Sequence, residues 1–446
     1  MAAQGAREHA RFDPWPFVVG LASLVIYLLL RQRTLHVEGA ATLVMIDAGQ
    51  PVGGSVRLLF APLTHALTEF GRSAGVALTP YWAGVGVNAT AMAIGVTLLH
   101  RAARGFGLDR REGLVAGAMV ASCPAVVYFA TAFNHLGLLL AFSGLATLLL
   151  VRLIQSPSWP RAILVGLGTA AAWFADGSAH YLPLWFALFL LMHVRAPRPT
   201  QPFETLILIA VMLGVHLIVT SLGGALLAAR GIPVEDPSRL FSWIEWRGLG
   251  GRPWSELVSG SLVDEWLRPF LPLSLLALAG LFLRRTRPVA VVLHLALLPY
   301  LLACFAWTRA PGFGALLLPL AWPAAMVAGQ MLRRWFGVVF VVVGLGLAML
   351  HTQERNPVDL ARARVEGLEL AAAGRPVLLL VGVIEDLSLS YVELPRVERL
   401  FLPRYAVQPK EGVERSLPQV VARIREHIAR GGCVLMPAPS QRELAD

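Results

Sequence analysis

Long apolar runs recur between residues 17 and 351 and constrain the fold of this chain more than any other feature. Runs of roughly 17 to 25 residues recur among them, and as helices these would cross the ~30 Å hydrocarbon layer of a bilayer. Backbone groups inside a membrane must be hydrogen-bonded within the protein, so such runs fold as helices. We therefore predict an all-α polytopic membrane domain over residues 1–351, followed by a different domain over residues 352–446.

The apolar runs predict about eleven transmembrane helices. We place them at 17–30, 80–99, 113–131, 136–154, 162–175, 181–194, 204–229, 268–283, 288–307, 314–332 and 336–351. The run at 55–71 is also apolar, but it contains Arg57, Pro62 and His65, so we expect a helix lying in the membrane interface. No small-residue cleavage site follows the first span, so we expect a retained anchor rather than a signal peptide.

Arginine clusters follow every second span and predict the orientation in the membrane. The clusters are Arg101, Arg104, Arg110 and Arg111; Arg152 and Arg161; Arg195 and Arg198; Arg284, Arg285 and Arg287; and Arg333 and Arg334. Positive residues concentrate on the cytoplasmic side of membrane proteins, so this face is predicted to be cytoplasmic. Arg31 and Arg33 are exceptions on the outer side. An odd number of spans then places the C-terminal domain outside the cytoplasm.

Composition excludes other classes of protein. The chain is 56% hydrophobic and 15% charged, with a mean hydropathy of +0.63, which is far more apolar than a soluble domain. The net charge of +10 comes largely from the arginines at span ends, so it does not indicate nucleic-acid binding. The three cysteines, Cys123, Cys304 and Cys433, are odd in number and two lie in apolar runs. This pattern indicates neither a disulfide framework nor a metal site.

Residues 352–446 change character and predict a small α/β domain. The expected elements are a helix beginning at Asn356-Pro357, a strand at Val377–Val383, a helix capped by Ser416 with Pro418 in its first turn and ending at Gly431-Gly432, and a strand at Val434–Met436. The Gly-rich loop of a nucleotide-binding fold is missing after Val383, so nucleotide binding is not the favoured interpretation.

The first outer loop carries two carboxylates, Glu38 and Asp47, just after the first span. A carboxylate outside the membrane could take the proton of an acceptor hydroxyl during glycosyl transfer, while a cation stabilises the departing phosphate. We therefore name Glu38 and Asp47 as candidate catalytic residues. The alternative is that both are solvated loop charges.

Other outer-side polar residues are candidates for contacting a substrate. Asp176 and His180 lie in a tight turn between two spans, where acids are often functional, although Asp-Gly is also a common solvated turn. Arg309, in a later outer turn, is a candidate phosphate contact, and His65 belongs to the interfacial segment. The Asn134-His135 pair fits a polar cap of a helix hairpin better than a ligand.

Three stretches resemble one known superfamily. Residues 39–65, beginning Gly-Ala-Ala-Thr-Leu-Val-Met-Ile-Asp-Ala-Gly-Gln-Pro, resemble the first-loop region of bacterial protein O-mannosyltransferase-like proteins of the GT-C superfamily. Residues 166–191 resemble the paired-helix segment of these proteins, and residues 313–329 resemble their late Leu-Leu-Pro span. Gly39, Gly49 and Pro51 keep the family spacing. The family's Asp and Glu fall on Val37 and Ala40, and Glu38 between them is the candidate replacement. The Arg that often precedes the late span is replaced by Ala315, with Arg309 the nearest arginine.

The resemblance implies a multi-pass glycosyltransferase of the bacterial inner membrane. Such a protein transfers a sugar from a polyprenyl-phosphate donor on the extracytoplasmic face, and a divalent metal cofactor stays open. The alternative is a non-catalytic GT-C-fold scaffold, or a subunit of a membrane assembly with protein partners. A transporter is the third class, but the sequence shows no clear internal repeat and almost no charge in the middle of its spans.

Overall fold

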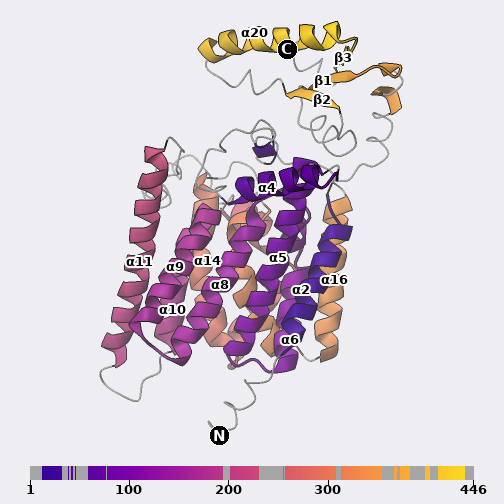
Figure 1. Cartoon of the computed structure of the whole chain (residues 1–446). Coiled ribbons are helices and arrows are strands. Elements are labelled where there is room, and N and C mark those ends of the chain that lie inside the picture. The colour runs from indigo at the N-terminus through magenta and orange to yellow at the C-terminus, as the bar shows by residue number, and fades with distance from the viewer. Residues whose placement is uncertain are drawn as a thin grey trace.

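A bundle of upright helices makes up most of the computed structural model, and a small sheet with one helix lies beyond one end of the bundle (Figure 1). The structure describes residues 13–32, 39, 42–43, 46, 59–76, 78–193, 201–230, 255, 257–307, 313–332, 334–353, 366–368, 372–381, 397–401 and 410–436.

The first half of the bundle contains helices whose ends follow from local sequence. They are α2 (Trp15–Leu29), α5 (Pro80–Gly105), α6 (Arg110–Ser122), α7 (Pro124–Ala130), α8 (Leu136–Gln155) and α9 (Trp159–Ala175). Thr79 caps α5 by accepting a hydrogen bond from the backbone N–H of Trp82, and Asp109 with Glu112 forms a capping box on α6. α6 and α7 together form the predicted span 113–131 but bend by 57° at Pro124, which cannot continue a straight helix.

The second half is more broken. It contains η2 (Gly177–Tyr181), α10 (Leu182–His193), α11 (Gln201–Ala229), η4 (Leu257–Leu267), α13 (Leu273–Ala279), η5 (Gly280–Phe282), α14 (Arg287–Trp307), η6 (Ala315–Leu320), α15 (Ala321–Met331) and α16 (Arg334–Gln353). Every predicted span therefore coincides with a helix or with consecutive helical segments. The predicted span 268–283 is not one continuous helix, because turn residues separate η4 from α13 and a 3-10 turn ends it.

Three helices among the described residues, α5, α8 and α11, are individually long and apolar enough to cross a membrane, and the bent α6–α7 pair would be a fourth. The other apolar helices are shorter, and in the run 314–332 a 3-10 turn that contains Pro319 precedes α15. The helical membrane fold is thus confirmed, whereas the count of about eleven spans stays a prediction.

Helix α4 (Phe60–Ser73) lies across the end of the upright helices, as predicted for the interfacial segment (Figure 1). One side of α4 is buried through Phe60, Ala61, Thr64, Thr68 and Gly71. Leu63, Leu67 and Phe70 are exposed on its other side. This two-sided pattern is the one expected of a helix that covers a protein surface and presents apolar side chains to a membrane interface.

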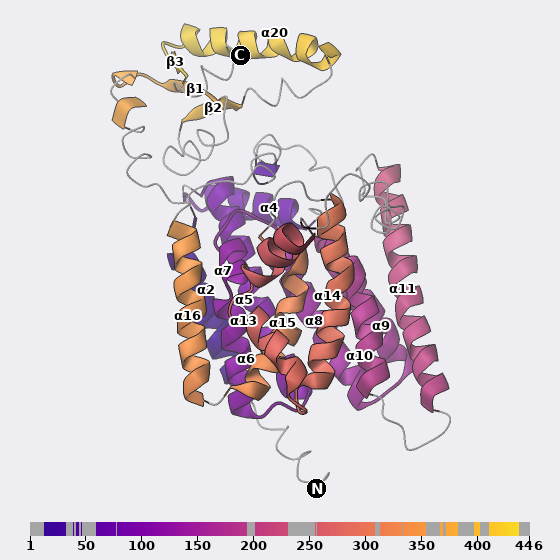
Figure 2. The same ribbon diagram turned by 180° about the vertical axis from the view of Figure 1, so that it is seen from behind.

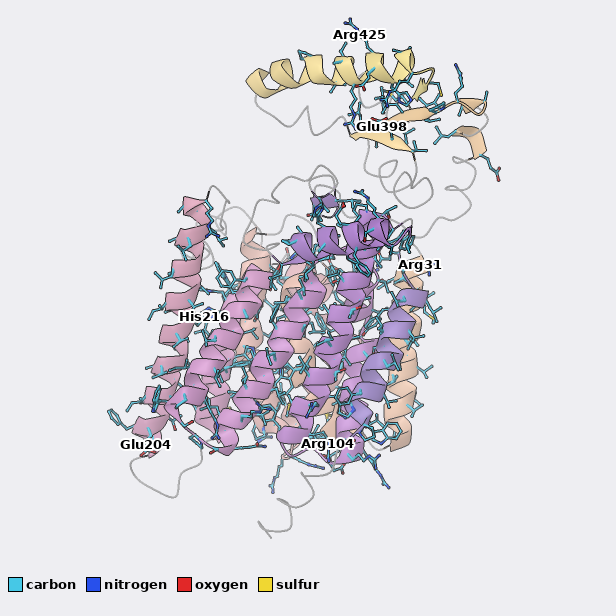
Figure 3. The ribbon with its side chains drawn as sticks, in the orientation of Figure 1. Arg31, Arg104, Glu204, His216, Glu398 and Arg425 are labelled. Carbon is cyan, nitrogen blue, oxygen red and sulfur yellow. The ribbon has the colours of Figure 1, made fainter. Side chains whose placement is uncertain are left out.

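Arginines of two of the predicted clusters lie at the end of the bundle opposite α4. Arg104 forms an ion pair with Asp13 at 3.8 Å, Arg110 lies over the Trp15 ring at 5.3 Å, and Arg285 pairs with Glu112. Figure 3 shows Arg104 at this end and Arg31, one of the two predicted exceptions, at the other end. Arg195, Arg198 and Arg333 lie outside the described residues. Arg104, Arg110 and Arg285 thus lie at the end opposite Arg31, while the orientation in the membrane stays a prediction.

Close packing of α5 and α8 forms the centre of the bundle. At Gly95 the two backbones approach so closely that a Cβ atom would lie 2.8 Å from the backbone carbon of Leu140. Large buried side chains such as Trp173, Trp185 and Tyr300 fill the space between the other helices. The outer faces of α11 and α16 expose rows of apolar side chains, as expected of helices in contact with lipid.

The C-terminal domain contains a three-stranded parallel sheet with the order β2-β1-β3. The strands are β1 (Val377–Val381), β2 (Glu398–Phe401) and β3 (Cys433–Leu435), and helix α20 (Lys410–Ala429) lies along the sheet (Figure 2). The predicted cap at Ser416 is wrong, because α20 begins at Lys410 and continues through Pro418. A proline removes only one helical hydrogen bond, so it bends or weakens a helix without always starting one. β3 begins one residue before its predicted start, and Asn356-Pro357 lies outside the described residues.

Candidate functional site

Two turns at the α4 end of the bundle carry a buried, hydrogen-bonded pair of a histidine and an aspartate. Asp176 ends α9 and begins η2, where its Oδ1 accepts a hydrogen bond from the backbone N–H of Ser178 at 2.8 Å. His135 immediately precedes α8. The Nε2 atom of His135 lies 3.0 Å from Oδ2 of Asp176, and both residues are buried. The open alternative of a solvated Asp-Gly turn is therefore wrong.

The surroundings of Asp176 favour its ionised form. Burial by itself raises the pKa of this carboxyl group, but the hydrogen bond and charge of His135 and the hydrogen bonds from Ser178 lower it more. The pKa of Asp176 consequently lies below its usual range. Asp176 is thus a carboxylate that only accepts hydrogen bonds, and it fixes the orientation of the His135 ring.

A second polar chain runs from the η2 turn into α11. His180 Nδ1 lies 3.1 Å from His216 Nε2, and His216 Nδ1 lies 3.1 Å from Thr169 Oγ1. The Thr169 hydroxyl donates to the carbonyl oxygen of Gly166, so Thr169 accepts from His216 and His216 accepts from His180. Burial lowers the pKa of His180 to about 4, which keeps this ring neutral at physiological pH.

Asn88, fully buried in α5, holds the turn that presents His135. Its Nδ2 donates hydrogen bonds to the carbonyl oxygens of Phe129 and Ala132, and its Oδ1 accepts from the N–H of Gly137 at 2.7 Å. One amide side chain therefore binds the chain on both sides of His135. Such a clamp fixes the position of the ring before any substrate is present.

The start of the first outer loop is attached to the same turn. The backbone N–H of Gln32 donates to the carbonyl oxygen of Thr131 at 2.8 Å, and its Nε2 donates to that of Tyr128 at 2.7 Å. The Tyr81 hydroxyl donates to the carbonyl oxygen of Gln32. These bonds tie Gln32, which precedes the loop, to the end of α7 and the start of the α7–α8 turn.

A buried apolar cluster also joins the first loop to both turns. Its members include Leu43 and Ile46 of the loop, Phe60 of α4, Phe133 beside His135, and Ala175 beside Asp176. The Phe60 and Phe133 rings meet edge to face, with centroids 5.3 Å apart. The first loop, the α7–α8 turn and the α9–η2 turn thus converge at one end of the bundle.

Some of the sequence-predicted site residues are buried in the structure, one is exposed, and others lie outside the described residues. Asp176 and His180 lie in one buried turn, each bonded to a histidine, whereas His65 lies exposed on α4. Glu38, Asp47 and Arg309 lie outside the described residues, as do Val37 and Ala40, so the predicted convergence of the first-loop acids with Arg309 stays a prediction.

Sequence reasoning found the Asn134-His135 turn but missed its main role. Asn134 does cap the hairpin, because its Oδ1 accepts from the N–H of Leu136 at 3.0 Å. The partnership of His135 with Asp176 was not foreseen, since the two residues are separated by two helices. His216 was missed as well, although a histidine inside the apolar run 204–229 was a signal, because a polar ring there needs a partner.

The described residues contain no group of three or more His, Cys, Asp or Glu side chains that could hold a metal ion. The His135–Asp176 pair and the His180–His216 pair are each joined by a hydrogen bond. Histidines held in this way can transfer protons and bind hydroxyl groups.

Comparison with known proteins finds a family match over part of the chain. A sequence model of the family described as dolichyl-phosphate-mannose-protein mannosyltransferase matches residues 73–221, about a third of the chain. This segment runs from the residues before α5 into α11 and includes His135, Asp176, His180 and His216. No curated protein matches the sequence.

A solved structure extends the likeness over the whole chain. The crystal structure of ArnT from Cupriavidus metallidurans in the apo state matches with a TM-score of 0.53 and 14% sequence identity, covering 100% of this chain and 95% of that chain. The predicted resemblance to GT-C superfamily membrane glycosyltransferases is thereby confirmed, and the fold is that of a multi-pass membrane protein of this class.

Proposed function

We propose that this protein transfers a sugar from a polyprenyl-phosphate donor to an acceptor hydroxyl on the extracytoplasmic side of the membrane. The observation that carries the proposal is the position of the buried His135–Asp176 pair. The pair lies inside the segment that matches the mannosyltransferase family, at the end of the bundle where the first loop begins. Buried ionisable pairs of this kind concentrate at sites of chemistry.

The arginines support the proposed side of the reaction. Arg104, Arg110 and Arg285 gather at the end opposite α4, which supports a cytoplasmic location of that end. The first loop and the two convergent turns then face outward. This orientation would place the site, and the C-terminal domain with it, outside the cytoplasm of a bacterial inner membrane.

In the proposed site, the first-loop acid Glu38 or Asp47 faces the anomeric carbon. A carboxylate there would stabilise the positive charge that develops on the sugar as its bond to phosphate breaks. Arg309 would bind the departing phosphate, His180 and His65 would contact the substrates, and Asp176 would act through the ring of His135. The polyprenyl chain would lie along the apolar outer faces of the helices.

A second function is favoured by one specific observation. The acids of the GT-C family's first loop fall on Val37 and Ala40, which carry no charge. A chain that kept the fold and lost its acids would be a scaffold or a subunit of a membrane assembly. In that case Asp176 and His135 would serve only to hold the bundle together.

Reconstitution of the purified full-length protein in liposomes tests the two functions. Polyprenyl phosphates carrying different radiolabelled sugars would be supplied with hydroxyl acceptors, and release of polyprenyl phosphate would be measured. We expect transfer by the wild type and a fall of about 10²–10³-fold in Glu38→Gln or in Asp47→Asn, whichever acid stabilises the charge on the sugar. No transfer by the wild type from any donor would favour the non-catalytic function.

A further inference from the structure

We propose that His135, held by Asp176, is the general base that removes the proton from the acceptor hydroxyl. This inference rests on the proposed function and assigns to a buried histidine the proton that the sequence alone assigned to a first-loop acid. In this assignment His135 is the catalytic residue and Asp176 is a positioning residue, because Asp176 acts through the ring of His135.

The hydrogen bonds around the pair determine which ring nitrogen is available. Asp176 uses Oδ1 to accept from Ser178 and Oδ2 to face His135 Nε2 at 3.0 Å. Since a carboxylate accepts and cannot donate, Nε2 carries the hydrogen and Nδ1 carries the lone pair. Nδ1 makes no hydrogen bond to any residue that the structure describes, and the His135 side chain keeps 9% of its surface exposed. The ring is thus oriented on one side and open on the other.

This arrangement is the base-and-orienter half of a catalytic triad, recognised by geometry rather than by sequence order. The carboxylate holds the imidazole in one tautomer and stabilises the positive charge that the ring gains with a proton. The pKa of Asp176 lies below its usual range, so the carboxylate stays ionised while the ring changes its charge. Tyr300 of α14 is the other titratable group that interacts electrostatically with Asp176, and its ring packs on Tyr181 at 4.8 Å.

The neighbouring histidines are arranged differently. His180 and His216 use their facing nitrogens on each other, and the chain ends on Thr169. His65 is exposed on α4, and His294 of α14 bonds through Nδ1 to the carbonyl oxygen of Ala290. His135 combines a buried carboxylate partner, an open ring nitrogen and a backbone fixed by Asn88 on both sides. A base that is already in place avoids an entropic cost when the acceptor arrives.

The proposed step is balanced in atoms and charge. The acceptor oxygen forms a bond to the anomeric carbon, and its proton passes to Nδ1 of His135. The bond between the anomeric carbon and the phosphate oxygen breaks, and its electron pair leaves with the polyprenyl phosphate. The imidazolium, stabilised beside Asp176, then releases its proton to water and returns to the starting state.

The test compares pH–rate profiles of reconstituted wild type, His135→Gln, Asp176→Asn and Asp176→Glu, with His294→Gln as the matched control. The glutamine amide can still donate to Asp176, so His135→Gln keeps the buried hydrogen bond and removes the base. In His135→Gln we expect kcat to fall about 10²–10⁴-fold while the donor KM is unchanged. The remaining rate of this variant should no longer decrease at acidic pH. Asp176→Asn should lower kcat without changing KM, Asp176→Glu should restore part of it, and His294→Gln should resemble wild type.

A second variant protects the test against misfolding. In His135→Ala, added imidazole should restore transfer in proportion to its concentration, which a merely structural role of His135 would not produce. An active wild type together with a His135→Gln variant that keeps its rate and its acidic limb would overturn the inference and leave the proposed function standing. Absence of transfer by the wild type from every donor would overturn both.

Discussion

Replacing Asn88 by leucine should separate the turn of His135 from the helix that holds it. Leucine has the same branching and number of side-chain heavy atoms as asparagine, although it is bulkier, and it offers no hydrogen bond. The carbonyl oxygen of Ala132 and the N–H of Gly137 would then lose the partner they have in the structure, whereas Phe129 would keep a second bond from the N–H of Ala132. Each buried backbone group left without a partner costs about 1–3 kcal/mol, so Asn88→Leu should destabilise the protein by about 2–6 kcal/mol.

Unfolding by titration with denaturing detergent, followed by tryptophan fluorescence, measures this change in free energy. Asn134→Ala is the control, because it removes one capping bond in the same turn and should cost only about 1 kcal/mol. Glycosyl transfer should fall more in Asn88→Leu than in Asn134→Ala, since only the former frees both sides of His135. An unfolding free energy of Asn88→Leu within about 1 kcal/mol of wild type would refute the clamp.

Three further predictions concern other parts of the chain. Burial lowers the pKa of His180 to about 4. The unfolded chain therefore binds a proton at His180 below about pH 6.5, whereas the folded chain binds it only near pH 4. The free energy of unfolding should consequently fall as the pH falls from about 6.5 to about 4. The melting temperature of His180→Gln should depend less on pH there than that of wild type. Gly95→Ala should destabilise by about 1–3 kcal/mol through a clash with α8, whereas Gly86→Ala, which meets open space, should be neutral or slightly stabilising in the same detergent titration. A reporter active only in the cytoplasm, fused after Asp446, should be silent, and a strong signal would contradict the predicted orientation.

The helical architecture was predictable because one physical constraint dominates it. Apolar runs, arginine clusters and the polar residues of the segment at 55–71 each reflect the cost of placing charge in hydrocarbon. These signals are local in sequence, so they can be recognised without knowing any contact between distant residues. The interruptions of the later spans were harder to predict, since a 3-10 turn such as η6 leaves the hydropathy of its run unchanged.

The candidate site was only partly predictable, because its decisive contacts join distant segments. Asp176 was singled out from its position in a turn between spans, but its partner His135 was assigned to a simple cap. Nothing in the local pattern shows that α8 and α9 bring these two turns within 3.0 Å. His216 was hidden for a related reason, since an apolar run of high hydropathy masks one polar residue whose partner lies on another helix.

The continuous apolar run of β1 explains how the C-terminal domain relates to the site. Alternate residues of a strand point to opposite faces, so an unbroken run such as Val377–Val381 requires both faces of the sheet to be covered. Leu378 lies in a cluster with Val420 of α20, which covers one face. Leu379 and Val381 belong instead to the cluster that contains Leu43 and Phe60 at the end of the bundle. The sheet therefore lies between α20 and the bundle (Figure 2). Because the two faces have different partners, a polar residue at Leu379 should loosen the domain from the first loop, whereas one at Leu378 should unfold the domain itself.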